Sequence, residues 1–307
     1  MSMKELVIAT RESPLALWQA EFVKAALEAA HPGLRVSLLG MRTQGDRWLS
    51  SPLSEVGGKG LFIKELEQAL LDGRADLAVH SMKDVPAHLP DGFVLPVIAY
   101  RDDVRDALVS AADGGVAGLP AGSRVGSASL RRQAQLRARR PDLDVSPIRG
   151  NVGTRLSKLD SGEYDALLLA SAGLRRLGLE ARISEHLSVD DSMPSAGQGA
   201  LGIECLAAAA EVRELLGVLD DAAVNACVSA ERAVSAGLGA DCSAPLGAYA
   251  ERHGDRLHLR AVLGTVDGSR LLRAEATGSD PGAVGAEVVE LLLAQGAAAI
   301  LDSLDLP

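Results

Sequence analysis

Short apolar runs alternate with amphipathic stretches through the first two thirds of the chain. The runs are typical of buried strands and occupy 6–10, 34–39, 77–80, 93–100, 124–127, 145–148 and 166–170. Helical spacing of apolar positions separates several of them, as in 14–30, where Ser13 supplies an N-cap and Pro14 the first helical residue. This alternation predicts a parallel α/β architecture.

The same pattern predicts where the chain divides. Polar and glycine-rich stretches at 100–105 and 193–199 indicate two crossings between lobes, and the strand at 201–205 would return the chain to the first lobe. From about 220 the pattern changes to a helix, strands near 248, 257–263 and 271–276, and a closing helix at 283–294. We therefore expect a first lobe of 1–100 plus 199–219, a second of 101–198, and a small α+β domain of 220–307.

Charge and composition exclude some classes of function. The 307 residues carry a formal net charge of -10 and only 3 Phe, 2 Trp and 3 Tyr, which argues against a general polyanion binder and a base-stacking platform. Between 124 and 176, however, basic residues outnumber acidic ones, so positive charge is concentrated in the second lobe. Neither nucleic acid nor a membrane is an expected partner.

The cysteine and histidine positions indicate the compartment and the metal content. Cys205, Cys227 and Cys242 have no metal-ligand spacing, and a reducing compartment is the simpler interpretation. No histidine pair has zinc-ligand spacing, so no metal is expected. The apolar stretch at 6–9 is too short for a secretory signal, and no run could span a bilayer, which predicts a soluble cytoplasmic protein.

Two glycine-rich motifs have alternative interpretations. The segment 197–202 matches the dinucleotide-binding pattern, but Pro194 precedes it and a strand follows, where the motif requires the reverse order. A crossing between lobes explains it better. The segment 57–60 could present backbone N–H groups and Lys59 to an anion, or could be a mobile loop before a helix.

Arginines recur where predicted strands lead into predicted helices. They are Arg11, Arg131, Arg132, Arg149, Arg155 and Arg176. A helix N-terminus offers free N–H groups, and an arginine beside it grips a carboxylate or phosphate in bidentate fashion. As a set they predict a cleft for a substrate with many negative groups, although any single one could be a solvated surface residue.

Asp84 and Cys242 are candidate reactive groups. Asp84 follows a predicted strand beside Lys83, where it could be an ordinary surface ion pair or a carboxylate that stabilises a developing cation. Cys242 lies in a turn-like segment, which favours an exposed thiol, whereas Cys205 and Cys227 lie in predicted strand and helix and fit buried positions.

These motifs, taken in order, resemble the porphobilinogen deaminase (hydroxymethylbilane synthase) family. The likeness covers nearly the whole chain. It rests on the segments IATR with SPLA (8–16), GKGLF (58–62), HSMKD (80–84), SLRR (129–132), RGNV (149–152), GQGA (197–200) and the cysteine loop ending in PLG (245–247).

The resemblance implies a fold and a reaction. The fold would be two lobes like those of periplasmic binding proteins plus a C-terminal α+β domain. The reaction would be head-to-tail condensation of four porphobilinogen molecules, with loss of ammonia, into the linear tetrapyrrole hydroxymethylbilane, carried out by a monomeric transferase of haem and porphyrin biosynthesis. A dipyrromethane cofactor would be attached covalently through Cys242.

The resemblance also implies residue roles. Asp84 would be the catalytic acid. The cofactor would be held by Cys242, Lys83, Ser127, Ser129, Arg131 and Arg132. Substrate or growing chain would be held by Arg11, Ser13, Arg149, Asn151, Arg155 and Arg176, together with Lys59 and Phe62 on a mobile loop and Gln198 at the hinge.

One departure from the family pattern carries a chemical consequence. Ala240 and Asp241 replace a small, glycine-rich pair before Cys242, and a carboxylate beside a thiol disfavours the thiolate, so attachment of the cofactor is expected to be slower. Two other functions compete with the family reaction. One is a non-enzymatic two-lobed protein that binds a polycarboxylate or phosphate, and the other is a nicotinamide-dependent enzyme built on 197–202.

Overall fold

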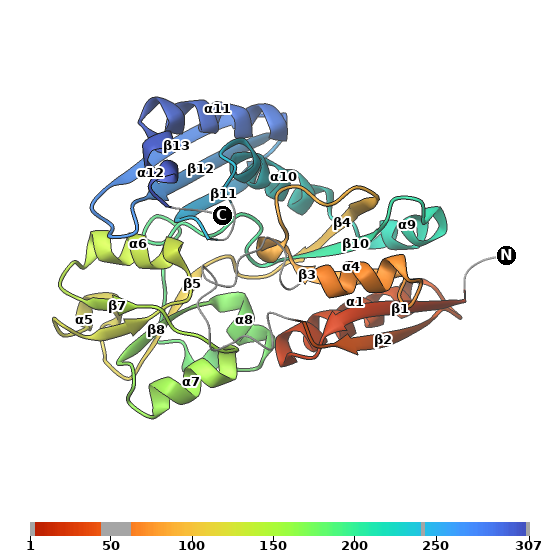
Figure 1. Ribbon diagram of the computed structural model, residues 1–307, viewed down its shortest axis with the longest axis horizontal. Coiled ribbons are helices and arrows are strands. Elements are labelled where there is room, and N and C mark those ends of the chain that lie inside the picture. Colours follow the sequence, from red (N-terminus) through yellow and green to blue (C-terminus); the bar gives the residue numbers. More distant parts are fainter. Residues whose placement is uncertain (1–3, 44–62, 241–242, 305–307) are drawn as a thin grey trace.

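The computed structural model describes residues 4–43, 63–240 and 243–304. These residues form two five-stranded sheets and one three-stranded sheet (Figure 1). In that view the first sheet lies to the right, the second at the lower left, and the C-terminal sheet above them. Among the described helices, none is long and apolar enough to cross a membrane.

The first sheet has the strand order β2-β1-β3-β10-β4. Its strands are β1 (Glu5–Arg11), β2 (Arg35–Met41), β3 (Leu77–Ser81), β4 (Phe93–Arg101) and β10 (Ala200–Leu206). The helical elements around it are α1 (Pro14–Ala30), α4 (Lys64–Leu71), η1 (Met82–Asp84), α9 (Ala210–Leu216) and η3 (Gly217–Leu219). Ile8 packs in the same cluster as α1, and its neighbour Ala9 packs with α4, so both faces of the sheet are covered.

The second sheet has the order β7-β6-β8-β5-β9. Its strands are β5 (Asp106–Ser110), β6 (Arg124–Gly126), β7 (Asp144–Ser146), β8 (Ala166–Ala170) and β9 (Glu185–His186). Its helical elements are α5 (Gly115–Gly118), α6 (Leu130–Arg139), α7 (Val152–Asp160), α8 (Ser171–Arg176) and η2 (Glu180–Arg182). Leu168 packs with α6 and Leu167 with α7, which again covers both faces.

The third sheet is an antiparallel meander, β11-β12-β13. Its strands are β11 (Leu246–His253), β12 (Arg256–Gly264) and β13 (Leu271–Gly278), and its helices are α10 (Ala222–Gly237), α11 (Pro281–Ala294) and α12 (Ala297–Asp302). Leu257 and Leu259 of β12 are buried in one cluster with Val234 and Val288 of the two long helices, while His258 between them is only half-buried. One face of this sheet therefore forms the core.

The expectation of a parallel α/β architecture is wrong for one strand in each five-stranded sheet. β10 pairs antiparallel with β3 and β4, and β5 pairs antiparallel with β8 and β9. Along the chain, each of these strands is the first one after a crossing between the two sheets. A buried antiparallel strand has the same apolar pattern as a buried parallel one, so the pattern does not encode the reversal.

The sequence pattern located most elements and missed the short ones. β5, β9, α5, α8, α9 and α12 were not expected, and the helix expected to close the chain is followed by α12. These elements have no more than 7 residues, too few for a clear periodic pattern. β5 begins with the charged residue Asp106, so only three consecutive apolar residues mark it as a strand.

Helix caps fix the chain where strands lead into helices. As predicted, Ser13 caps α1, and its Oγ accepts a hydrogen bond from the Ala16 N–H at 3.4 Å. Asn151 caps α7, with its Oδ1 3.1 Å or less from both the N–H and the hydroxyl of Thr154. These caps hold two helix N-termini just beyond the carboxyl ends of β1 and β7.

Candidate active site

The predicted site residues lie at the carboxyl ends of strands in both five-stranded sheets. Lys83 and Asp84 form η1, directly after β3, and Arg11 ends the neighbouring parallel strand β1. In the second sheet Ser127 follows β6, and Arg149 follows β7. Ligand sites of open α/β sheets form at this edge, so the placement agrees with the sequence argument.

The pKa of Lys83 shows that site residues of the first sheet and of the second sheet lie within electrostatic reach of each other. Burial lowers its pKa from 10.5 to about 8, and the nearby carboxylate of Asp84 only partly opposes this effect. The guanidinium groups of Arg132 and Arg131, which belong to α6 in the second sheet, lower the pKa of Lys83 further. A lysine of the first sheet and two arginines of the second therefore form one cationic region.

Arg155 and Arg149 extend this region. Burial lowers the pKa of Arg155 from 12.5 to about 10, the charges of Arg132 and Arg149 lower it further, and Asp84 opposes them. Burial also lowers the pKa of Arg149. Within the described part of the chain, no residue donates a hydrogen bond to the Asp84 carboxylate or forms an ion pair with it. The exposed carboxylate of Asp84 thus lies among several closely spaced cations, an arrangement that favours binding of a polycarboxylate.

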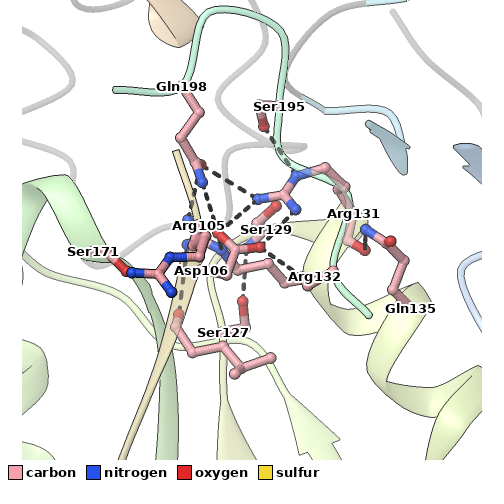
Figure 2. A network of polar contacts seen from close by, with 12 residues as sticks. Arg105, Asp106, Ser127, Ser129, Arg131, Arg132, Gln135, Ser171, Ser195 and Gln198 are labelled. Atoms are coloured by element: carbon pink, nitrogen blue, oxygen red, sulfur yellow. Dashed lines mark hydrogen bonds and ion pairs between the residues drawn. The ribbon is translucent and has the colours of Figure 1, made fainter. Parts of the chain in front are cut away.

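Asp106, at the start of β5, is the residue that the sequence argument missed. It is fully buried, and its carboxylate receives Arg131 Nη1 at 2.7 Å, Arg131 Nη2 at 3.1 Å and Arg132 Nε at 2.8 Å (Figure 2). The Ser192 hydroxyl and the Gln198 amide also donate to it, at 2.7 and 2.9 Å. Its one signal in the sequence is an acidic residue at the head of an apolar run.

The pKa of Asp106 follows from these contacts. Burial acts to raise it, but the charges of Arg131 and Arg132 and their hydrogen bonds outweigh burial and hold the pKa well below its ordinary value. The carboxylate is therefore ionised whenever the protein is folded near neutral pH. It neutralises one of the two arginines and fixes the direction of both.

The arginine pair is further held by the crossing between the sheets. Arg131 donates to the Ser195 hydroxyl at 3.0 Å and to the Met193 carbonyl. Gln198 accepts from Arg132 Nη2 at 3.2 Å through its Oε1 and donates to the Val104 carbonyl at 2.6 Å through its Nε2. Figure 2 shows Gln198 reaching down from the crossing onto this network.

The glycine-rich segment 197–202 is part of this crossing. Gly197 has φ +72°, and a Cβ added there would lie 2.7 Å from Cγ of Met82 in η1. β10 begins at Ala200, so the segment leads into a strand, as its sequence context predicted. The close approach explains why only glycine fits above η1.

Arg176 is held by aromatic rings and by the crossing between the sheets. It ends α8 rather than standing at a strand-to-helix junction, and its guanidinium lies over the rings of Trp18 and Tyr100, 5.5 and 5.8 Å from their centroids. It donates to the Gly199 carbonyl, and its Nε lies 3.8 Å from Asp102. Its contacts therefore join α1, α8 and the crossing.

The remaining predicted residues occupy the first turns of helices or lie beyond the described residues. Ser129 is the N-cap position of α6 but makes no side-chain cap hydrogen bond, and the buried Ser127 accepts from its N–H at 3.3 Å. Lys59, Phe62 and Cys242 lie outside the described ranges. Cys205 and Cys227 are free and buried, as expected, and burial raises the pKa of both thiols, that of Cys205 to about 11.

Comparison with solved structures gives distant likenesses. The methionine binding protein MetQ has 13% sequence identity and a TM-score of 0.47, with 72% of this chain and 92% of that chain covered. The periplasmic aliphatic sulphonate binding protein SsuA from Escherichia coli has 17% identity and a TM-score of 0.43, with 76% of this chain and 70% of that chain covered.

Comparison with curated proteins and family models gives much closer ones. The chain is 57% identical over 304 residues to the porphobilinogen deaminase of Thiobacillus denitrificans, with 98% of this chain and 99% of the relative covered. It is 54% identical over 303 residues to that of Laribacter hongkongensis, with 98% of each covered. Residues 6–214 match the model "Porphobilinogen deaminase, dipyromethane cofactor binding domain", and 225–294 match the "Porphobilinogen deaminase, C-terminal domain". The chain belongs to the porphobilinogen deaminase family.

Proposed function

We propose that the chain is a transferase that joins four porphobilinogen molecules head to tail, with loss of ammonia, into hydroxymethylbilane. The observation that carries the proposal is Asp84, an exposed carboxylate within electrostatic reach of Lys83, Arg132 and Arg155. Each porphobilinogen carries an acetate and a propionate group, so a growing chain needs many cations around one reacting centre.

Asp84 performs the proton chemistry in this proposal. Loss of ammonia from the aminomethyl group of the substrate leaves a methylene-pyrrole cation, which a carboxylate facing the pyrrole N–H stabilises. The Asp84 carboxyl gives a proton to the departing amine and later takes the proton released when the new carbon–carbon bond forms and the ring regains aromaticity.

The cationic residues fit the dipyrromethane cofactor named in the family model. Lys83 and Arg132 have lowered pKa values because burial and mutual repulsion disfavour their charges, and the carboxylates of a bound anion would relieve that cost. We assign cofactor binding to these two residues with Arg131, Ser127 and Ser129. When bound, the cofactor supplies the pyrrole carbon to which the first substrate unit is joined.

Substrate binding is assigned to the strand ends and helix starts around Asp84. Arg149 and Arg155 have no described carboxylate partner within ion-pair distance and are the primary candidates. The rest of the proposed set is Arg11, Ser13, Asn151, Arg176, Lys59, Phe62 and Gln198. The amide of Gln198 is already engaged with Val104, Asp106 and the arginine pair, so its contribution would act through the hinge.

Cys242 is the proposed point of attachment of the cofactor. Cys205 and Cys227 are unsuitable for attachment, because each thiol is buried with a raised pKa and is therefore a poor nucleophile.

Intact mass of the denatured protein tests cofactor, attachment and family together. We expect an excess equal to two linked porphobilinogen-derived rings, absent from a Cys242→Ser variant. An unmodified mass that stays unchanged after incubation with porphobilinogen would contradict the attachment and favour a binding protein without catalysis.

A turnover assay with porphobilinogen tests the role of Asp84. Asp84→Ala should abolish turnover and Asp84→Glu should keep a trace, because only the latter retains a carboxylate. The mass test on Asp84→Ala serves as the control that the protein is folded and loaded. A near-normal rate in Asp84→Ala would overturn the assignment.

We also propose the division into a first lobe of 1–100 plus 199–219, a second lobe of 101–198 and a C-terminal domain of 220–307. The membership of the three sheets supports these limits, since β10 rejoins the first sheet after the second is complete. A cytoplasmic monomer is proposed as well, and light scattering of the purified protein should give the mass of one chain.

A further inference from the structure

The outer face of the C-terminal sheet carries a group of metal-ligating side chains. One face of β12 is buried against α10 and α11 through Leu257 and Leu259, so His258 between them points to the other face, where it is half-buried. Glu251 of β11 is directly opposite His258, and His253 lies two residues further along the same strand. All three therefore project from one face of one hairpin.

The three side chains are close enough to share one ion. One nitrogen of His253, one nitrogen of His258 and one carboxylate oxygen of Glu251 all lie within 4.8 Å of one another. The centroids of the two imidazole rings are 6.5 Å apart. Bond lengths of about 2.0–2.1 Å in a tetrahedral zinc site place its ligand atoms about 3.3 Å apart, a closure that side-chain rotation at this exposed face can supply.

The backbone beneath the group is rigid. β11 and β12 pair continuously from Leu246 to His253, and the opposite face of the hairpin is packed in the core. Ligand positions on paired strands change little, so binding requires only rotation of side chains.

Among the described residues, the hydrogen bonds to this group use Oε2 of Glu251 and Nε2 of His258, which leaves Oε1 of Glu251 and Nδ1 of His258 as donor atoms. Arg260 donates to Oε2 of Glu251 at 2.8 Å, but the same guanidinium also pairs with Asp190 at 2.6 Å, and Oε1 of Glu251 is not used in that contact. Glu275 of β13 lies 3.1 Å from Nε2 of His258. A carboxylate bonded to a histidine orients the ring and increases its basicity, as the outer partners of metal-bound histidines do.

We propose that His253, His258 and Glu251 bind one transition-metal dication, with Zn²⁺ as the reference ion. Two imidazole nitrogens and one carboxylate oxygen are the donors of zinc and its neighbours, whereas Mg²⁺ and Ca²⁺ take oxygen ligands. The ion would cross-link β11 to β12 and stabilise the C-terminal sheet, because it would bind the folded hairpin and not the unfolded chain.

The expectation that no histidine pair has zinc-ligand spacing is wrong, because four residues separate His253 and His258, a spacing found in zinc sites. The two histidines are brought together by the turn at Gly254 and Asp255, which places the end of β11 beside the start of β12. Spacing along the chain detects ligands on one helix or one knuckle, and a pairing across a hairpin needs the register.

Calorimetric titration of the full-length protein with ZnCl₂ tests the proposal. We expect one site that His253→Gln and His258→Gln each weaken at least tenfold, while His88→Gln, which removes a histidine outside the group, leaves it unchanged. Both ligand substitutions are on an exposed face, so the variants should fold, and far-UV circular dichroism checks this. Equal affinity and stoichiometry in wild type and the double variant would overturn the site.

Cobalt substitution gives a second readout. Co²⁺ in a site of low coordination number gives intense visible absorption bands, which should be present in the wild type and lost in Glu251→Gln and His258→Gln. Bands that persist in both variants would place the metal elsewhere and contradict the proposal. Porphobilinogen turnover should be the same in all these variants, so failure of the metal site and failure of the proposed activity are separate outcomes.

Discussion

A single buried carboxylate orients the two arginines that the proposed function assigns to the cofactor. Asp106 is wholly buried, and Arg131 and Arg132 are 1% and 5% exposed. This trio carries an excess of one positive charge, which the exposed Asp84 carboxylate only partly offsets at Arg132. That surplus, together with Lys83, is what a carboxylate of a ligand can neutralise.

Asp106→Asn should therefore destabilise the protein strongly. Two buried guanidinium groups lose the carboxylate with which both form ion pairs, and loss of one partner from a buried ion pair costs about 3–5 kcal/mol. Urea unfolding at pH 7 measures the change. The matched control is Asp142→Asn, which breaks an Arg–Asp pair of the same 2.7 Å length at the surface and should have a much smaller effect. Similar losses in the two variants would contradict the argument.

Lys83 should titrate far below an ordinary lysine in a chain without cofactor, such as purified Cys242→Ser. Its pKa is lowered from 10.5 to about 8, chiefly by burial. Between these two values the unfolded chain holds a proton that the folded chain has lost, so this residue makes stability rise with pH across that range. NMR of lysines labelled at Cε measures the titration, and Lys83→Arg identifies the signal among six lysines. A Lys83 signal that titrates near 10.5 would refute the assigned burial.

Residue types predicted the cations of the site but not their partners. Arg131, Arg149 and Arg155 stood out because they recur where strands lead into helices, and the structure places them in or beside one cationic region. Asp106 could not be found in this way, because its role depends on a contact across 25 positions of sequence. Arg176 was assigned to the same pattern, but it ends α8 instead of preceding a helix, and its guanidinium lies against aromatic rings.

At the scale of elements, helix starts bring polar groups to the site. α1 and α7 begin at Ser13 and Asn151, whose side chains accept hydrogen bonds from backbone N–H groups of the first turn. Both caps come shortly after strand ends, so the residues that start these helices also lie at the ligand edge of the sheet. A cap and a ligand contact can therefore be confused in a mutational scan.

Asn151 separates the two roles experimentally. Asn151→Ala removes the acceptor for the Thr154 N–H at 2.9 Å and should cost about 1 kcal/mol of stability, while Asn151→Ser keeps a cap of similar strength. Thermal unfolding gives the stability and porphobilinogen kinetics give KM. Asp280→Ala, which removes the cap of α11 far from the site, is the control that should lower stability alone. If Asn151→Ser raises KM without loss of stability, the side chain contacts substrate.

The hydrophobic pattern predicted the strands that are buried on both faces. It did not predict the direction of a strand within its sheet, and it missed short elements. β1, β3, β6 and β8 are apolar runs covered on both sides, and their positions were recovered to within two residues. The reversal of β5 and β10 was invisible because burial is the same in either direction. The glycine-rich crossing, by contrast, was recognised from Pro194 and from the strand that follows it.

The whole molecule is held together where the chain crosses between sheets. The buried Glu231, in α10, accepts two hydrogen bonds from Arg101 at the end of β4, at 2.8 and 3.1 Å. It also accepts from the Gly197 N–H at 2.7 Å and the Ala250 N–H at 2.9 Å. One carboxylate thus joins both crossings to the C-terminal sheet, and its charge holds the pKa of Arg101 above the ordinary value although burial acts to lower it.

Glu231→Gln should loosen the C-terminal sheet from the other two. The substitution leaves Arg101 buried without a counter-charge and replaces one acceptor oxygen by an amide that cannot accept from a backbone N–H, a loss of about 3–5 kcal/mol. Calorimetric unfolding should show a lower midpoint and a separate low-temperature transition for the C-terminal part, since the contacts that couple it to the crossings are those removed. Glu163→Gln, which breaks an exposed pair with Lys158, should leave a single transition near the wild-type midpoint. A single unshifted transition in Glu231→Gln would mean that apolar packing, rather than this carboxylate, couples the three sheets.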